Sequence, residues 1–273
     1  MRRALAFALA AACVAAACRP TPPDPAAIFD GTAGRWVDLT HAYSAASIYW
    51  PTDTLGFQLE QLAYGPTPGG WFYSSFRFSA AEHGGTHFDA PIHFSEGKLT
   101  ADRVPIDALV GPAAVVDVSA RANPDYLVTV EDLTGWEGAN GPLPEGGILL
   151  IRTGWGERYD DRTAYLGTAL TGPDAVAELH FPGISPEAAR WLVDNRGIVA
   201  VGIDTPSIDY GQSKDFQAHV ILYGQNVIGM ENVADLHLLP AKGAFVVALP
   251  MKIEGGSGGP LRIVAFVPNG AAG

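Results

Sequence analysis

Residues 80–94, AAEHGGTHFDAPIHF, contain His83, His87, Asp89 and His93, although the whole chain has only seven histidines. Imidazole and carboxylate groups are ligands of zinc, manganese and iron, and two histidines with one carboxylate can occupy one face of such an ion. Two histidines four residues apart can reach one ion from a helix, but the adjacent glycines and the proline argue against a helix here. We therefore expect a tight loop at a strand end, with glycines that let the backbone approach the site closely.

The density of this cluster favours a metal site over ordinary histidines. Isolated histidines are more often surface residues or hydrogen-bonded core residues than ligands. Here four candidate ligands stand within eleven residues, among turn residues and directly after the aromatic-rich segment 70–80. Asp89 is two residues from His87, so in an extended segment both side chains point to the same side. The residues alone therefore predict a metal site.

The composition indicates a folded, acidic protein. The chain has 273 residues, of which 48% are hydrophobic, and this is enough to bury a sizeable core. The formal net charge is −12 and the pI is near 4.9. A nucleic-acid partner calls for a basic face, so this charge excludes nucleic-acid binding as the function.

The first eighteen residues, MRRALAFALAAACVAAAC, predict export. Two arginines, a short apolar stretch and then small residues are typical of a secretory signal peptide, which we place at residues 1–17. Cys18 follows VAAA, which resembles a bacterial lipoprotein processing site, and the alternative is simple secretion after cleavage nearby. Residues 18–34 then contain a proline-rich tether. We expect a periplasmic or membrane-anchored lipoprotein, or a secreted protein, with a lipid on Cys18 as its one membrane contact.

Strands dominate the rest of the chain. Runs of β-branched and aromatic residues bounded by glycine, proline and aspartate indicate seven strands. They are residues 35–43, 70–80, 113–119, 146–154, 197–204, 244–253 and 261–267. The sequence therefore predicts one strand-dominated α/β domain over residues 35–273.

Helices are fewer. The clearest one spans residues 185–197, where Ser185 can cap the helix and Pro186 fits its first position. Gly197 can then end it in a left-handed conformation. Two weaker helical candidates are residues 128–136 and 219–225.

The segment HGGTHFDAPIH resembles the H-x-G-T-H-x-D-x-P-x-H motif of the cyclase-like metal-dependent hydrolases, which include bacterial kynurenine formamidases and isatin hydrolases. Four further blocks resemble this family over about residues 35–267, namely IYWPTDT, VGIDTPSID, FQAHVILYGQNVIGMENV and PMKIEGGSGGPLRIVAF. In IYWPTDT, Thr52 stands where the W-P-G-D-T segment of this family usually has its glycine. The resemblance implies a single strand-rich α/β domain of the swivelling β/β/α type, with a barrel-like β core flanked by a few helices. It also implies a homodimer or a higher homo-oligomer.

The resemblance implies a site with five metal ligands, one catalytic residue and one substrate contact. These are the ligands His83, His87, Asp89, His219 and Glu231, the proton-transferring His93, and Trp50 against the substrate ring. The first three ligands would hold one ion, and Asp89 would bridge to a second ion. Isatin hydrolases look mononuclear, often with manganese, and lack a histidine at the position that corresponds to His219. The presence of His219 therefore favours two divalent ions, with zinc as the first choice and manganese as the alternative.

The chemistry of such a site is hydrolytic. A metal lowers the pKa of bound water from about 15.7 to near 7, which produces hydroxide at neutral pH, and it polarises the carbonyl under attack. A histidine can protonate the leaving nitrogen, because its pKa lies near neutral pH. Spacing alone leaves open whether His93 does this or is a further ligand.

Three functions are compatible with these residues. The first is hydrolysis of an aryl formamide such as N-formylkynurenine, a step of tryptophan catabolism, by metal-bound hydroxide. The second is an isatin-hydrolase-like reaction on another cyclic amide or lactone. The third is an exported, non-catalytic binding module with a structural metal, but a structural site is closed by its ligands and needs no proton carrier. Export counts against a cytosolic role in tryptophan breakdown.

Two other motifs have simpler explanations. GGSGGP, residues 255–260, fits G-x-S-x-G, but a proline and a strand follow where a nucleophile elbow needs a helix. We expect a glycine-rich hairpin or lid near the site. In GIDTPSID, turn and cap formation explains Asp204, Ser207 and Asp209 as well as a substrate role does, so they stay outside the catalytic set. The aromatic residues of segment 70–80, which are Phe72, Tyr73 and Phe76, are expected in the core and pocket wall.

Overall fold

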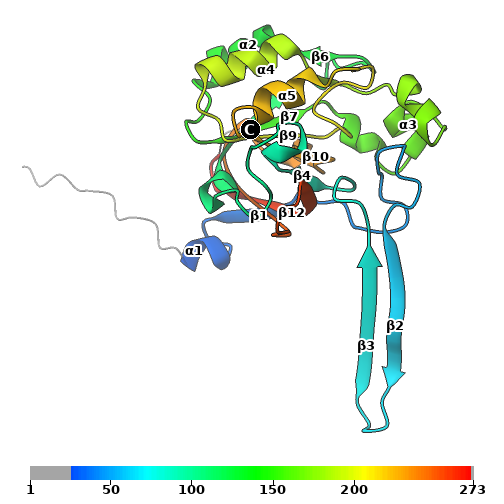
Figure 1. Cartoon of the computed structure of the whole chain (residues 1–273). Helices are drawn as coiled ribbons and strands as arrows, with labels where there is room; N and C mark the ends of the chain where they lie inside the picture. The colour runs from blue at the N-terminus through cyan, green and yellow to red at the C-terminus, as the bar shows by residue number, and fades with distance from the viewer. Residues whose placement is uncertain (1–25, 272–273) are drawn as a thin grey trace, which may run out of the picture.

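A mixed sheet that closes into a barrel forms the centre of the computed structural model, which describes residues 26–271 (Figure 1). Its strands, in spatial order, are β1 (Gly34–Asp38), β12 (Gly258–Pro268), β11 (Lys242–Pro250), β5 (Val110–Asp117), β7 (Ile148–Arg152), β9 (Ala200–Ile203), β10 (Ile228–Glu231) and β4 (His87–Asp89). Because β4 also pairs with β12, seven of these strands form a closed ring, and β1 lies outside it on β12. The predicted barrel-like core is confirmed.

The parallel half of the barrel is covered on its outer face by helices. The pairs β5–β7, β7–β9 and β9–β10 are parallel, and strands buried on both faces are nearly continuous apolar runs. In β7, Ile148 and Leu150 pack inside the barrel, whereas Leu149 and Ile151 pack against the helices. The covering helices are α2 (Val130–Asn140), α4 (Pro186–Asn195) and α5 (Gln217–Tyr223). This layer positions α5 over the end of the barrel that contains β4.

The predicted helix at 185–197 is confirmed as α4, with a different end. Ser185 Oγ accepts a hydrogen bond from Ala188 N at 3.0 Å, and Pro186 is the first helical residue. The helix ends at Asn195, and its C-cap Arg196 is extended (φ −136°), so Gly197 supplies no left-handed cap. The guanidinium of Arg196 instead pairs with Glu137 on α2, which holds this end of the helix. The two weaker helical candidates correspond to α2 and α5.

Several further elements are short. They include α1 (Ala26–Phe29), α3 (Arg162–Leu166), and a separate parallel pair of β6 (Leu127–Val128) and β8 (Gly183–Ile184). The predicted signal peptide and Cys18 lie outside the described residues, as does the first part of the tether. Within residues 26–271, no helix is both long enough and apolar enough to cross a membrane.

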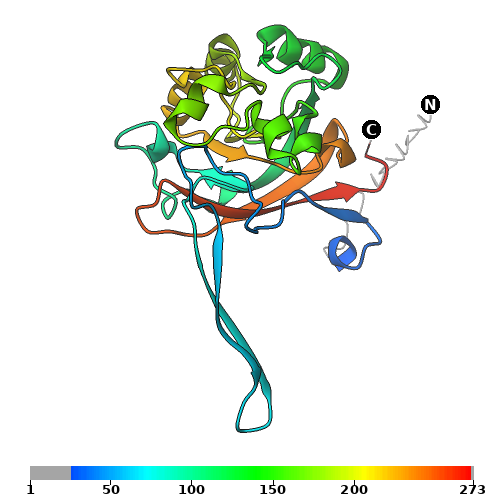
Figure 2. The same ribbon diagram turned by 90° about the vertical axis from the view of Figure 1, so that its right-hand side faces the viewer.

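A two-stranded antiparallel ribbon projects from the barrel as a long arm (Figures 1 and 2). It consists of β2 (Gln58–Pro66) and β3 (Phe72–Ser79), which pair only with each other. The sequence predicts β3 but not β2. The expected burial of Phe72, Tyr73 and Phe76 is wrong, because these side chains are 59%, 53% and 44% exposed. A strand pattern specifies alternating faces, but it does not specify whether another layer covers them.

Candidate metal centre

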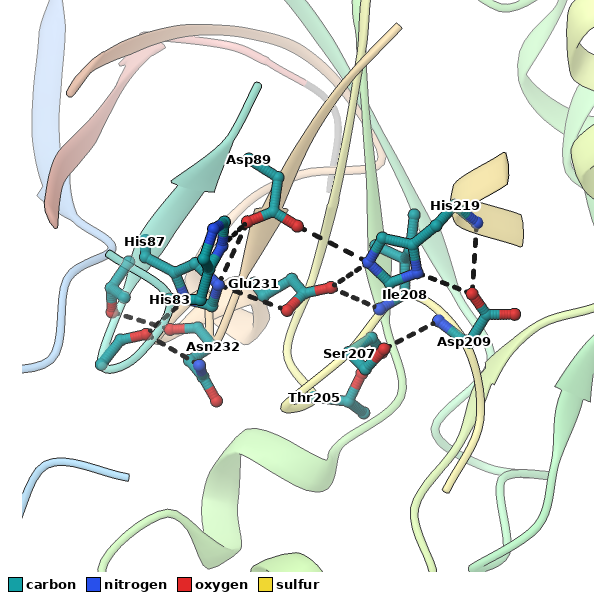
Figure 3. Close-up of polar contacts among 12 residues, drawn as sticks. His83, His87, Asp89, Thr205, Ser207, Ile208, Asp209, His219, Glu231 and Asn232 are labelled. Carbon is teal, nitrogen blue, oxygen red and sulfur yellow. Dashed lines mark hydrogen bonds and ion pairs between the residues drawn. The ribbon is translucent and has the colours of Figure 1, made fainter. Parts of the chain in front are cut away.

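Strand β4 places two predicted ligands side by side. His87 and Asp89 alternate with Phe88, which packs inside the barrel. His87 Nε2 therefore lies 3.2 Å from Asp89 Oδ1, as expected for residues two apart in an extended strand. Glu231 in β10 is the register partner of His87, and its Oε2 lies 3.4 Å from His87 Nε2. Three predicted ligands thus meet across one pair of strands (Figure 3).

The loop before β4 carries His83. Gly84 forms an isolated bridge with Tyr49, and a Cβ at Gly84 would lie 2.1 Å from the Tyr49 ring, so only glycine fits this close approach. The His83 ring contacts Asp89 Oδ1 through Nδ1 at 2.7 Å and Ser257 Oγ through Nε2 at 2.9 Å. The expected tight loop at a strand end is therefore present, because it follows β3 (Phe72–Ser79) and leads into β4.

Helix α5 brings the fourth histidine to the same place. His219 Nε2 lies 3.5 Å from Asp89 Oδ2 and 3.2 Å from Glu231 Oε1. Its other ring nitrogen, Nδ1, lies 2.6 Å from Asp209 Oδ2. One turn later in α5, Tyr223 donates a hydrogen bond to Asp89 Oδ2 at 2.8 Å. The helix thus presents one imidazole and one hydroxyl to the two carboxylates.

Two overlapping groups of possible ligands result. They are His83, His87 and Asp89, and Asp89, His219 and Glu231, with the ligand atoms of each group within 4.8 Å of one another. Asp89 and Glu231 each turn one oxygen toward His87 and the other toward His219 (Figure 3). Each of the two carboxylates therefore lies between His87 and His219 and offers one oxygen to each imidazole.

The chemistry of the donors fits a divalent metal. His87 Nε2 is buried and makes no hydrogen bond within residues 26–271, although it faces two carboxylates. Buried carboxylates that lack a compensating positive charge are costly. Nitrogen and carboxylate oxygen donors suit zinc, manganese or iron. These buried groups indicate a metal site, and the identity and number of the ions stay predictions.

The electrostatics of the protein without an ion show the same need for positive charge. Burial alone would lower the pKa of His87, but the carboxylates of Asp89 and Glu231 raise it to about 10. Burial likewise opposes a proton on His219, yet Asp209, Asp89 and Glu231 raise its pKa well above the ordinary value. Protons on these imidazoles therefore compensate the buried carboxylates, and a divalent cation would take over this role.

The centre opens into a cavity of about 240 Å³ with mainly apolar walls. Trp50 lines it and meets Phe216 edge-on, with ring centroids 6.2 Å apart. His93 ends a single 3₁₀ turn that begins at Pro91, and its ring stacks on His83 at 3.7 Å. His93 belongs to neither ligand group. The structure thus brings all seven predicted site residues together, while their individual roles stay predictions.

Sequence reasoning missed several residues that support the ligands. Asp209 accepts a hydrogen bond from His219 N. In the sequence, the one sign of this role is that Asp209 belongs to the motif GIDTPSID, which turn formation explains equally well. Ser257 faces His83 and donates to Glu82 Oε2 at 2.5 Å. The glycine-rich segment 255–260 does lie beside the site as expected, where the turn after β11 ends and β12 begins.

Comparisons with known proteins agree with this geometry. The Cyclase family model matches residues 37–210. The chain is 38% identical over 197 residues to an isatin hydrolase of Roseibium aggregatum, covering 68% of this chain and 72% of that protein. It is 31% identical over 228 residues to a kynurenine formamidase of Salinibacter ruber, covering 84% and 95%.

Solved structures of relatives share the fold. Isatin hydrolase A from Labrenzia aggregata, bound to benzyl benzoate, has a TM-score of 0.79 at 35% identity, covering 89% of this chain and 96% of that one. Isatin hydrolase A from Ralstonia solanacearum has a TM-score of 0.78 at 33% identity, covering 92% and 100%. The family model matches more than half of the chain, and the fold and the buried histidine and carboxylate side chains of the protein agree with this match. The protein therefore belongs to the Cyclase family of metal-dependent hydrolases.

Proposed function

We propose that the protein hydrolyses a cyclic amide of the isatin type. The observation that carries this proposal is the small aromatic cavity, which lies directly over the histidine and carboxylate centre and has no lysine or arginine in its lining. N-formylkynurenine carries an amino-acid group with an ammonium and a carboxylate, and the lining of this cavity offers its carboxylate neither a lysine nor an arginine. A flat, uncharged cyclic amide needs none. The identity to isatin hydrolases supports the same choice.

The residues have complementary tasks in this reaction. Water adds to the carbonyl carbon, the ring C–N bond breaks, and the released nitrogen takes a proton. Divalent ions, when bound, activate the water and polarise the carbonyl. Trp50 and Phe216 hold the ring by their faces and edges. His93, beside His83 on the cavity wall, is placed to move the proton to the leaving nitrogen.

Aryl formamide hydrolysis is the second candidate. The observation that favours it is His219 together with Glu231, a pair that the family resemblance associates with the dinuclear formamidases. The same two residues support two divalent ions per chain, with zinc first and manganese second. Elemental analysis at full loading tests this number, and a ratio of no more than one ion per chain contradicts it.

Hydrolysis assays separate the candidates. We expect the zinc- or manganese-loaded protein to hydrolyse isatin with a kcat/KM at least about tenfold above that for N-formylkynurenine. The chelated protein serves as the control and should be inactive. A preference for N-formylkynurenine would establish the second candidate instead. Retained metal without hydrolysis of either compound would support a structural metal in a binding module.

We also propose export, with Cys18 as the lipid attachment site. Support comes from the arginines and the short apolar run of residues 1–17. Cys18→Ser should move the protein from the membrane fraction to the soluble periplasmic fraction. A wild-type protein that is already soluble there, or in the medium, would favour simple secretion.

A further inference from the structure

Asp209 lies behind His219, which is one of the predicted metal ligands and lines the cavity. Its carboxylate is buried, with 2% of the residue exposed. Oδ2 accepts from His219 N at 3.1 Å and lies 2.6 Å from His219 Nδ1. Oδ1 accepts from Ala218 N at 3.0 Å and from Ser213 Oγ at 3.4 Å. Every one of these contacts goes to α5 or to the loop before it (Figure 3 shows the contact with His219).

The contact with His219 fixes the direction of a metal ligand. A carboxylate can only accept, so Nδ1 must carry a hydrogen, and the lone pair of the neutral ring is then on Nε2. Nε2 is the atom that faces Asp89 Oδ2 and Glu231 Oε1. Such a carboxylate behind a histidine sets the tautomer and the orientation that metal binding needs.

The contact with Ser213 extends the same control to the cavity. Ser213 Oγ accepts from Phe216 N at 3.1 Å while it donates to Asp209. Phe216 has a left-handed backbone (φ 49°, ψ 45°), which is rare for a bulky residue and persists only when its surroundings hold it. Its ring lines the cavity between Trp50 and Phe94, with centroids 6.2 Å and 5.3 Å away. The strained backbone is therefore what aims this ring at the substrate space.

We infer that Asp209 is a positioning residue with two effects. Through His219 it orients the second group of ligands, Asp89, His219 and Glu231, which we call the second position. Through Ser213 and Phe216 it holds the aromatic wall of the cavity. This inference rests on the proposed function in one respect, because it assumes that His219 binds an ion. A single buried carboxylate then couples the occupancy of the second position to the shape of the cavity that faces it.

The first test separates metal positioning from simple stabilisation. Asp209→Asn keeps the size of the side chain, but its amide group can donate to Nδ1 and so place the ring hydrogen on Nε2. We expect zinc binding at the second position to weaken by about 10–100-fold in a chelator competition titration, with the first position unchanged. Asp215→Asn makes the same change at an exposed position of the same loop and should bind both ions as the wild type does. Equal weakening at both positions, or none, overturns the inference for His219.

The second test addresses the cavity. Ser213→Ala removes the support of Phe216 but leaves the Asp209–His219 contact. We expect both ions to bind normally while the KM for isatin rises several-fold and kcat changes little. An unchanged KM overturns the part assigned to Phe216. The failure of the proposed function would look different, because the metal-loaded wild-type protein would then not hydrolyse isatin. Binding of a single ion by the wild-type protein would instead contradict the premise that His219 binds an ion.

Discussion

At the scale of single residues, His93 differs from the other histidines of the centre in its surroundings. Its ring stacks on His83, and it belongs to neither group of possible ligands. Burial lowers the pKa of His93 to about 4. The ring is therefore neutral at pH 7, with a lone pair that can take a proton from water and pass it to the leaving nitrogen.

This assignment predicts different results for two alanine variants. His93→Ala should keep the bound metal while lowering turnover by about 10²–10⁴-fold, the usual contribution of a positioned acid or base. His87→Ala should lose metal as well, because Nε2 of His87 faces both carboxylates. Metal content and turnover should be measured on both variants together. Equal metal loss in the two would make His93 a ligand.

The raised pKa of His87 predicts how the stability of the metal-free protein depends on pH. The folded value of about 10 lies above the ordinary value of 6.5. The proton on His87 therefore stabilises the fold fully below pH 6.5, and this contribution is lost as the pH rises toward 10. The free energy of unfolding should fall by at most about 1.4 kcal/mol per pH unit for this one group. His219, whose pKa is also raised, adds to the fall in the same direction.

Urea titrations of the chelated protein between pH 6.5 and 9 measure this slope. The metal-loaded protein is the control, because an ion in place of the proton removes this contribution of His87. Stability of the chelated protein that rises with pH across this range would show that His87 holds no extra proton. It would also mean that the buried carboxylates are compensated in another way.

At the scale of elements, strand β10 and helix α5 approach each other closely because Gly229 has no side chain. A Cβ at Gly229 would lie 2.0 Å from the Tyr223 hydroxyl and 3.3 Å from Asp89 Cβ. The absence of this atom lets Tyr223 reach Asp89 Oδ2. Gly229→Ala should therefore lower the free energy of unfolding by about 1–3 kcal/mol, by overpacking, and should weaken metal binding.

A matched glycine gives the control for this variant. Gly138 lies inside α2, and a Cβ there would meet no atom within 4 Å among the described residues. Gly138→Ala should raise the free energy of unfolding by about 0.5–1 kcal/mol, because alanine is the better helix former. Equal effects of the two substitutions in urea unfolding would show that the contact of Gly229 with Tyr223 is not tight.

The elements also show which parts of the fold the sequence could predict. The seven predicted strands are all present. They could be predicted because long runs of β-branched and aromatic residues are a local signal of a strand. The strands β4 and β10 have three and four residues, too few for a period, yet they carry His87, Asp89 and Glu231. The first ligand cluster could be found because it is local. The place of Asp209 behind His219 depends on how the loop folds back onto α5, which a motif of turn-forming residues does not specify.

At the scale of the whole molecule, the arm formed by β2 and β3 projects away from the barrel, and β2 and β3 pair only with each other (Figure 2). Tyr64 and Phe72 pack edge-on with each other, but they remain 65% and 59% exposed. A two-stranded ribbon is marginally stable in water unless something packs against it, and large exposed apolar surfaces commonly mark association sites. The family resemblance implies a homodimer or a higher homo-oligomer, and we propose that a second copy binds at the arm.

This expectation is tested by adding charge to the arm and, separately, to the barrel. Tyr64→Glu combined with Phe72→Glu should convert a dimer into a monomer in size-exclusion chromatography with light scattering, because a buried unpaired carboxylate is costly at an apolar contact. Ile106→Glu, at a residue that is 66% exposed outside the arm, should leave the dimer intact. Both proteins should retain wild-type metal content, since the arm carries none of the ligands. A monomeric wild type, or an arm variant that stays dimeric, would show that the apolar surface of the arm has another purpose.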